Sequence, residues 1–266
     1  MRIVSVLPSG TEFIYALGRS SCLVGVSDHC DFPPYHLKNL SRLGPFLRPC
    51  LEAILDLHPD LVLLDGTYQG QLAQDLSRHG CRWLDGACRK AEEIGLFAVS
   101  LGKALGCPER GESLRFWFEA NWRRWERWSA GLTVKRPRVV RLLTALPDGR
   151  AIVAGGDTLQ GRALDLAGYE NGAASLAGYV VVEAERDFYT DLDGLVLCTF
   201  GPQRKTLADD GSLLGWWEDL PVVRSRSFVT VPCSLLCRAT HRWFTLLDLL
   251  ARQAHPSWPS YSPWRC

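Results

Sequence analysis

The sequence predicts an α/β protein with two lobes, each built on a parallel sheet, that one long helix joins. The first observation behind this prediction is that short apolar runs alternate with helical segments, with short connections between them. This alternation is typical of parallel strands linked by right-handed crossovers. The second observation is a long helical segment that interrupts the alternation. We therefore expect an N-terminal α/β lobe at residues 1–108, an inter-lobe helix at 109–132 and a C-terminal α/β lobe at 133–266.

The N-terminal lobe is expected to hold four strands, each followed by a helix. Strands are expected at residues 2–7, 23–26, 61–64 and 81–84, and helices at 9–17, 51–57, 69–79 and 91–105. At the first helix, Ser9 and Glu12 have the spacing of a capping box, in which each side chain pairs with a free backbone N–H at the helix start. Gly18 follows this helix, and a glycine there is a common helix end.

The linking segment carries a stripe of aromatic side chains. Phe118, Trp122 and Trp125 follow the i, i+4, i+7 spacing of one helix face. Trp117 and Trp128 flank the stripe, and arginines lie between these residues. The favoured interpretation is a core-facing stripe with arginines stacked on the indole rings. An aromatic ligand-binding surface is the alternative.

The alternation of strands and helices resumes after this segment. Strands are expected at residues 139–143, 195–200 and 227–231, and helices at 159–166 and about 235–253. The two halves of the chain therefore have a similar layout.

The composition is that of a globular protein, and it narrows the function classes. The chain has 266 residues, of which 47% are hydrophobic and 22% charged, and its formal net charge is +1. This balance leaves no basic footprint for nucleic acid, and no apolar run approaches the roughly 20 residues of a membrane-spanning helix. The apolar stretch after Arg2 is too short for a signal peptide. We expect a cytoplasmic protein, or a periplasmic or extracellular one if a leader was removed.

The chain shows no sequence motif of an enzyme. It has no Gly-x-Ser-x-Gly elbow, no phosphate loop ending in Gly-Lys-Ser/Thr, no His-Glu-x-x-His and no Gly-x-Gly-x-x-Gly after the first strand. We therefore expect a binding protein rather than an enzyme. A thiol nucleophile beside His29 is the catalytic alternative.

Several of the ten cysteines lie within or just after apolar runs that are expected to be strands. These are Cys30, Cys88, Cys198, Cys233 and Cys237. In open α/β folds, ligands bind beyond the carboxyl ends of the strands, so up to five thiols are expected in one crevice. Such a site suits a soft ligand: a metal, an iron–sulfur cluster, a metal chelate or a redox disulfide. His29, next to Cys30, is the best-placed histidine for an axial metal ligand.

The thiols also have a purely structural interpretation. Free cysteine is among the most buried residue types and packs as a small apolar side chain, and the chain has no Cys-x-x-Cys pair. Cys233 and Cys237 are four apart, which places both on one face if a helix begins there, and His241 extends that face. A disulfide between Cys233 and Cys30 or Cys88 is a further alternative.

The opening segment, residues 2–12, resembles the start of the cobalamin- and iron-chelate-binding proteins of ABC importers. These are class III periplasmic binding proteins, bilobal substrate-binding proteins with a helical backbone. Further stretches agree in order: residues 23–27, 30–34, 51–54, 59–62, 165–168, 170–171 and 255–256. The resemblance implies two Rossmann-like lobes, hinged by a rigid helix, with the ligand held in the cleft between them. It also implies that a glutamate on each lobe, here Glu52 and Glu185, pairs with arginines of the membrane transporter.

A corrinoid or similar planar chelate needs a wide, mostly apolar cleft with aromatic walls and a few polar groups. The residues expected to contact it are Ser9, Thr11, Phe32, Asp65, Thr67, Tyr68, Phe200 and Trp243. The expected function is capture of a metal-containing ligand for an ABC importer, the ligand being either a corrinoid-like chelate or a cysteine-ligated metal or iron–sulfur cluster. The alternative is a cytoplasmic redox or metal-cofactor-handling protein that reuses the fold with a cysteine-lined cleft.

Overall fold

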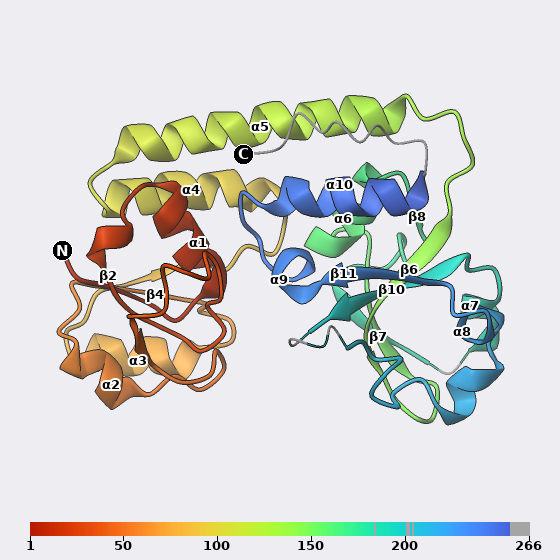
Figure 1. The fold of residues 1–266 in the computed structure, drawn as a ribbon, viewed down its shortest axis with the longest axis horizontal. Helices are drawn as coiled ribbons and strands as arrows, with labels where there is room; N and C mark the ends of the chain where they lie inside the picture. The colour runs from red at the N-terminus through yellow and green to blue at the C-terminus, as the bar shows by residue number, and fades with distance from the viewer. Residues whose placement is uncertain (184, 201–202, 204, 256–266) are drawn as a thin grey trace. The chain divides into compact units, whose positions relative to one another are not determined.

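The computed structural model describes residues 1–183, 185–200, 203 and 205–255, and the chain divides into two compact units (Figure 1). The first unit holds Met1–Glu119 together with Ala239–His241, and the second holds Ala120–Arg238 and the chain from Arg242 onward. The long helix α5 (Pro108–Ala130) runs from the first unit into the second. The long helix expected near residues 109–132 is therefore confirmed, and the division between the units falls within it.

The sheet of the first unit is parallel throughout, as the alternating pattern predicts. Its strand order is β3-β2-β1-β4-β5. The strands are β1 (Ile3–Ser5), β2 (Leu23–Val26), β3 (Ser41–Arg42), β4 (Leu61–Leu64) and β5 (Trp83–Asp85). The sequence analysis did not identify β3, because two exposed polar residues carry no apolar run.

Helices cover both faces of this sheet (Figure 1). They are α1 (Pro8–Ala16), α2 (Leu51–Asp56), α3 (Gly70–Arg78), α4 (Glu92–Ala104) and the start of α5, with a short 3-10 turn at Ser20–Cys22. On one face, Ile54 of α2 and Leu76 of α3 pack against Val62. On the other face, Phe13 of α1 meets Phe97 of α4 edge to face, with ring centroids 5.3 Å apart. The buried strands thus lie between two helical layers.

The start of α1 corrects the predicted capping box. The helix begins at Pro8, and Leu7 is the N-cap with no side-chain hydrogen bond. Proline suits the first helical position because its fixed φ fits the helix and its missing N–H is not needed there. Ser9 and Glu12 are instead buried inside the helix. Gly18, at φ +65°, ends the helix as expected.

The sheet of the second unit is parallel only in part. Its strand order is β11-β10-β6-β7-β9, and β8 also pairs with β6. The strands are β6 (Arg138–Ala145), β7 (Ala151–Ala154), β8 (Glu170–Asn171), β9 (Tyr179–Val182), β10 (Gly194–Thr199) and β11 (Phe228–Pro232). The β6, β8, β10 and β11 pairings are parallel, whereas β7 is antiparallel to β6 and β9. The sequence analysis missed this hairpin, although Pro147-Asp148-Gly149 at its tip is a turn signal.

The second unit contains the end of α5 and several shorter helices. They are α6 (Leu159–Leu166), α7 (Arg186–Thr190), α8 (Pro221–Arg224), α9 (Cys233–Leu236) and α10 (Trp243–Ala254), with a 3-10 helix at Gly215–Asp219. The single closing helix predicted for residues 235–253 is wrong, because the chain leaves helical conformation between α9 and α10. None of the helices in the described part of the chain is long and apolar enough to span a membrane.

The aromatic stripe of α5 faces the protein core, as the favoured interpretation predicts. Trp125 is buried, and Trp122 stacks on Trp243 of α10 with ring centroids 5.3 Å apart and nearly parallel planes. The guanidinium of Arg162, from α6, lies 5.5 Å from the centre of the Trp122 ring. Trp243 has no exposed surface. Its predicted role as a ligand contact is therefore wrong, since the ring is enclosed in this stack.

Candidate functional site

The carboxyl edge of the first sheet carries large apolar side chains that face solvent. Tyr35 follows β2, Leu47 follows β3 and Tyr68 follows β4, and they are 80%, 63% and 55% exposed. Because all these strands are parallel, the three loops lie along the same edge of the sheet. Contiguous patches of exposed apolar side chains mark binding surfaces, so the loops at this edge are a candidate binding surface. We call Tyr35, Leu47 and Tyr68 the apolar edge.

A partly buried ion pair lies next to Tyr68. Asp65 is buried, and its carboxylate pairs with the Arg89 guanidinium at 2.6 Å. The same carboxylate accepts hydrogen bonds from the backbone N–H groups of Thr67 and Tyr68. Arg89 in turn lies 5.0 Å from the centre of the Tyr68 ring, and Phe46 meets that ring edge to face at 6.1 Å. Asp65 is thus a positioning residue, while the side chains of Thr67 and Tyr68 are exposed.

Three of the other residues expected to contact a ligand lie in the first unit, and they differ in how far their side chains are buried. Ser9 and Thr11 are buried in α1, and their role as ligand contacts stays a prediction that this burial does not favour. Phe32 is half-buried in the loop after β2. Phe32 therefore remains a candidate next to the apolar edge.

Cys30 is part of an internal hydrogen-bond cluster, apart from the group of converging sulfurs found among the described residues. It is 1% exposed, and Thr11 Oγ1 donates to its sulfur at 3.1 Å. The hydroxyl of Ser27 lies 3.3 Å from the same sulfur. These hydroxyl groups satisfy the thiol inside the first unit, which does not favour its predicted role as a metal ligand.

Cys88 and His29 also fall outside any thiol cluster. Among the described residues, the search for three or more metal-ligating side chains with converging ligand atoms returns neither of them, nor Cys30. Burial, reinforced by the nearby Glu93 carboxylate, raises the pKa of Cys88 to about 12, so its thiol stays protonated at neutral pH. His29 is exposed, and its Nδ1 accepts a hydrogen bond from the backbone N–H of Phe46 at 3.1 Å.

In the second unit, the fold brings Cys198, Cys233 and Cys237 together. Their sulfur atoms all lie within 4.8 Å of one another, and those of Cys198 and Cys237 are 3.4 Å apart. Cys198 is the penultimate residue of β10, and Cys233 directly follows β11, which runs parallel beside it. The single turn of α9 then returns the chain so that Cys237 faces the other two. We call these three residues the thiol cluster; their role as metal ligands stays a prediction.

The prediction that Cys233, Cys237 and His241 share one helix face is corrected by the structure. Because α9 ends at Leu236, His241 does not extend the face of Cys233 and Cys237. His241 instead belongs to the first unit, where its ring lies 6.0 Å from that of Phe13.

The sequence analysis did not identify Arg141, which lies beside the thiol cluster. This residue of β6 is 4% exposed, and its Nη2 lies 2.8 Å from the Cys198 sulfur and 4.0 Å from that of Cys237. Its Nη1 donates to the backbone oxygens of Leu142 and Val196. Among the described residues, no carboxylate pairs with this guanidinium. A charged residue within the apolar run of residues 139–143 is the sequence signal that identifies it.

The surroundings of the thiol cluster separate the pKa values of its members. Hydrogen bonds from Cys198 and Cys233, with the Arg141 guanidinium beside them, lower the pKa of Cys237 well below its usual range. Hydrogen bonds with Cys233 and Cys237, together with burial, raise the pKa of Cys198. A buried guanidinium needs an anionic partner, and a thiolate at Cys237 provides one.

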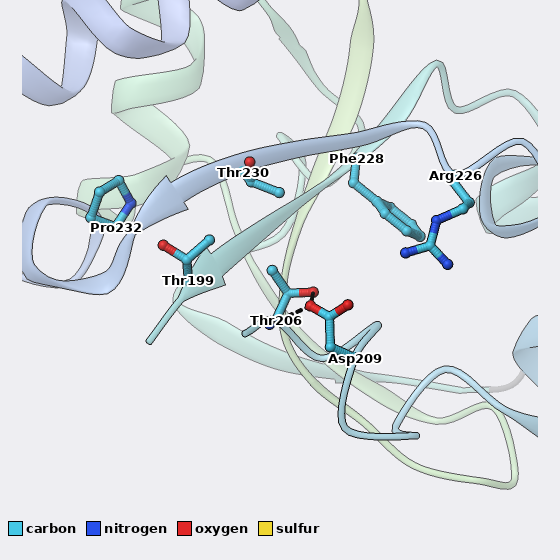
Figure 2. Close-up of a pocket in the computed structure, with 7 residues that line it drawn as sticks. All are labelled: Thr199, Thr206, Asp209, Arg226, Phe228, Thr230 and Pro232. Atoms are coloured by element: carbon cyan, nitrogen blue, oxygen red, sulfur yellow. Dashed lines mark hydrogen bonds between the residues drawn. The ribbon is translucent and has the colours of Figure 1, made fainter. Parts of the chain in front are cut away.

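A small pocket of about 310 Å³ lies beside β10 and β11 (Figure 2). It is lined by Thr199, Thr206, Asp209, Arg226, Phe228, Thr230 and Pro232. Asp209 accepts hydrogen bonds from the backbone N–H and the hydroxyl of Thr206, and these bonds lower the pKa of its carboxyl group. Phe200, the next residue after the β10 strand, is 44% exposed and remains a candidate contact. The pocket is at the small end of ligand sites and is too small for a macrocycle.

The two predicted docking glutamates are both exposed carboxylates, one in each unit. Glu52 lies in the first turn of α2, where its own backbone N–H and the Cys50 thiol lower the pKa of its carboxyl group. Glu185 directly precedes α7. Exposure and charge are compatible with docking to arginines, and this role stays a prediction.

Two α/β units, with one long helix running from the first into the second, define the class of ABC-importer substrate-binding proteins to which the sequence resemblance pointed. The chain belongs to the periplasmic binding protein family, whose model matches residues 3–197. The resemblance and the fold class inferred from the sequence are both confirmed.

Known relatives extend over nearly the whole chain. An uncharacterized ABC transporter substrate-binding lipoprotein, YvrC of Bacillus subtilis, is 24% identical over 96% of this chain and 80% of its own length. A vitamin B12-binding protein of Vibrio parahaemolyticus is 25% identical over 91% of this chain and 84% of its own length. Among solved structures, the periplasmic heme-binding protein RhuT from Roseiflexus sp. RS-1, in apo form, has a TM-score of 0.80 at 25% identity and covers 96% of this chain and 99% of its own.

Proposed function

We propose that this protein is the solute-binding component of an ABC importer and that it captures a metal-containing macrocycle, with a corrinoid as the preferred ligand. The observation that carries this proposal is the apolar edge of the first unit, with Tyr68 held over the Asp65–Arg89 ion pair. The vitamin B12-binding relative supports a corrinoid, and the heme-binding structural neighbour supports a flat metal chelate more generally.

A macrocycle needs this kind of surface because its ring and edges are largely apolar. Burial of apolar area contributes about 25 cal/mol for each Å², so covering the exposed half of one tyrosine contributes roughly 1–2 kcal/mol. Tyr68 is suited to this contact because the ion pair behind it already fixes its orientation, and little conformational entropy is lost on binding. Thr67, Phe32 and Phe200 are proposed as further contacts.

The second ligand class inferred from the sequence, a metal or cluster held by cysteines, now has fewer residues to support it. Cys30 takes part in hydrogen bonds inside the first unit, burial raises the pKa of Cys88, and neither joins the group of converging sulfurs, so a five-thiol centre is not proposed. The remaining three cysteines are proposed below as a separate site. The redox or cofactor-handling alternative rests on the close approach of the Cys198 and Cys237 sulfurs alone, and it is not the function proposed here.

The proposed function also implies a docking partner, the membrane subunits of the importer, and a compartment outside the cytoplasmic membrane. We propose that Glu52 and Glu185 pair with arginines of the membrane subunits, because each is an exposed carboxylate on its own unit. The relatives are named as a lipoprotein and as periplasmic proteins, which supports a site of action outside the cytoplasmic membrane. Charge reversal at Glu52 is expected to abolish co-purification with the membrane subunits in the native host, whereas reversal at Glu112, on α5, is the control.

The decisive experiment is a ligand titration of the purified protein. Cyanocobalamin and hemin are added separately, and quenching of the ten tryptophans reports binding. Tyr68→Ala is expected to weaken binding of the preferred ligand about tenfold, which corresponds to about 1.4 kcal/mol. Phe116→Ala is the matched control, since Phe116 is an exposed aromatic residue on α5 of the same unit. Absence of binding for both ligands, or equal losses in the two variants, would contradict the proposal.

A further inference from the structure

We propose that Cys198, Cys233 and Cys237 form a three-thiolate site for a soft divalent cation of the class of Zn²⁺ and Cd²⁺. All three ligands come from the second unit, so the site is complete within it. This inference goes beyond the proposed function, because the occupant is a bare ion rather than a macrocycle.

The spacing of the sulfur atoms fits such an ion. Zn–S bonds of about 2.3 Å in a tetrahedral site place two sulfurs about 3.8 Å apart. In the thiol cluster, the Cys198 and Cys237 sulfurs are 3.4 Å apart and all three lie within 4.8 Å of one another. Each sulfur therefore needs to move by less than about 1 Å to reach ligand geometry, which a small rotation about the Cα–Cβ bond provides. Cys237 is exposed, so solvent can supply a fourth ligand.

The charge on Arg141 explains why this place favours a divalent cation. Its guanidinium is buried, its Nη2 points at the sulfurs of Cys198 and Cys237, and its Nε has no hydrogen-bond partner. Three thiolates, one guanidinium and one divalent cation together carry no net charge, which is the state that a partly buried site stabilises most. On binding, each sulfur forms one bond to the cation, and any proton it still carries passes to solvent.

The donor set also limits the class of metal. Among the described residues the group contains sulfur ligands alone, and thiolates select soft ions over Mg²⁺ or Ca²⁺, which need oxygen ligands. An iron–sulfur cluster commonly uses four cysteines, one more than this site offers. A mononuclear site with three sulfurs and one solvent position fits the geometry better.

A disulfide between Cys198 and Cys237 is the competing chemistry. It would require their sulfurs to approach from 3.4 Å to about 2.05 Å. It would also remove two electrons and both negative charges from the sulfurs nearest Arg141, and the buried guanidinium would lose its anionic partners. The position of Arg141 therefore favours the metal-bound state over the disulfide.

The test is a titration of the full-length chain, reduced and purified without air, with Cd²⁺ and then with Zn²⁺. We expect sulfur-to-cadmium charge-transfer absorption in the ultraviolet that saturates at one ion per chain, with the stoichiometry confirmed by native mass spectrometry. Competition with a chromophoric chelator gives the affinity for Zn²⁺. The titration contains no macrocycle, so its result does not depend on whether the protein binds one. Failure of the metal site can therefore be distinguished from failure of the proposed function.

The variants separate the thiol cluster from the remaining cysteines. Cys233→Ser and Cys237→Ser are each expected to weaken binding at least about 100-fold, since loss of a ligand costs more than loss of its supporting hydrogen bond. Cys22→Ser, in the first unit, is the matched control and should bind as the original chain does. Because Cys237 is exposed, its variant is expected to fold, and circular dichroism checks this.

Two outcomes would overturn the inference. The first is unchanged affinity in a folded Cys237→Ser variant, which would place the bound ion elsewhere. The second is absence of binding by the reduced chain, together with peptide mapping that finds a Cys198–Cys237 disulfide re-formed as soon as air is admitted.

Discussion

Cysteines lie near the carboxyl edges of both sheets, yet the two units surround them with different chemistry. In the first unit, Thr11 and Ser27 hydroxyls enclose Cys30, and burial keeps Cys88 protonated. In the second unit, three sulfurs meet beside the Arg141 guanidinium. A position at the end of a strand therefore does not decide what a thiol does. The neighbouring charge decides it, because a guanidinium stabilises thiolate whereas hydroxyl groups and apolar contacts stabilise the neutral thiol.

The surfaces of the two units also differ. The first unit exposes the apolar edge, whereas the second unit exposes other apolar side chains, such as Val181 and Phe200, and has a small pocket lined in part by Asp209, Arg226 and three threonines. The units thus share a layout of strands and helices but present different binding chemistry.

The largest expected contrast is in thiol reactivity. Alkylation of the reduced, metal-free chain at pH 7 should label Cys88 at least about 100-fold more slowly than Cys237, because only the thiolate reacts. The pKa of Cys88 is raised to about 12, so its labelling should accelerate as the pH rises from 7 to 9. The pKa of Cys237 is lowered, so its labelling should stay constant over that range. Peptide mass spectrometry measures both rates, and parallel pH profiles would remove the contrast between the units.

Arg141 is the residue that distinguishes the two sets of thiols, and its removal tests the comparison directly. Arg141→Gln is expected to lower Cd²⁺ affinity about 10- to 100-fold, because the charge beside the sulfurs is lost while their ligand atoms remain. Thr11→Val, which removes the hydroxyl beside Cys30, should leave Cd²⁺ affinity unchanged. Chelator competition measures both variants. Equal Cd²⁺ affinity in Arg141→Gln and the original chain would show that the guanidinium does not offset the negative charge of the three thiolates.

Cys30 should contribute to stability rather than to binding. Cys30→Ala removes a buried sulfur and the acceptor of the Thr11 hydroxyl, so we expect the free energy of unfolding to fall by about 1–2 kcal/mol. Urea denaturation followed by circular dichroism measures the change. Cys50→Ala, at an exposed position, is the control, with an expected change within about 0.5 kcal/mol. A loss of ligand affinity in Cys30→Ala at unchanged stability would reverse this assignment.

The smallest expected effect concerns the support behind Tyr68. Asp65→Asn breaks the ion pair with Arg89 but keeps an oxygen that can accept the turn hydrogen bonds. Macrocycle affinity should fall only about three- to tenfold, because Tyr68 keeps its surface and loses its fixed orientation. Asp75→Asn, which breaks an exposed ion pair with Arg78 on α3, is the control. If the two variants bind equally, Arg89 does not position Tyr68.

Much of the fold could be predicted from the sequence, because apolar periodicity reports directly on burial. The strand at Leu61–Leu64 and the helix at Leu159–Leu166 were predicted with their observed bounds. The failures have local causes. The strand at Tyr179–Val182 lies on the edge of the sheet and alternates between exposed and half-buried residues. The break between α9 and α10 has no glycine or proline to mark it.

The candidate sites were harder to predict, because they depend on side-chain direction. Sequence order placed Cys30 and Cys198 equally well at strand ends, and only the structure distinguishes the hydroxyl cluster from the thiol cluster. Trp243 was expected to contact a ligand as an aromatic residue, although it stacks inside the core on Trp122. Tyr68 was identified correctly as a loop residue, while the ion pair behind it joins residues 24 positions apart and leaves no local signal.

The three residues Ala239–His241 belong to the first unit although the chain on both sides of them belongs to the second. The polypeptide therefore crosses between the units three times, once within α5 and twice around this short segment. A gene fragment that stops after α5 would deprive the first unit of His241, whose ring packs near Phe13. An N-terminal fragment expressed alone therefore lacks part of its own unit. Such a fragment should be supplied with residues 239–241, either as a separate peptide or fused to its C-terminus.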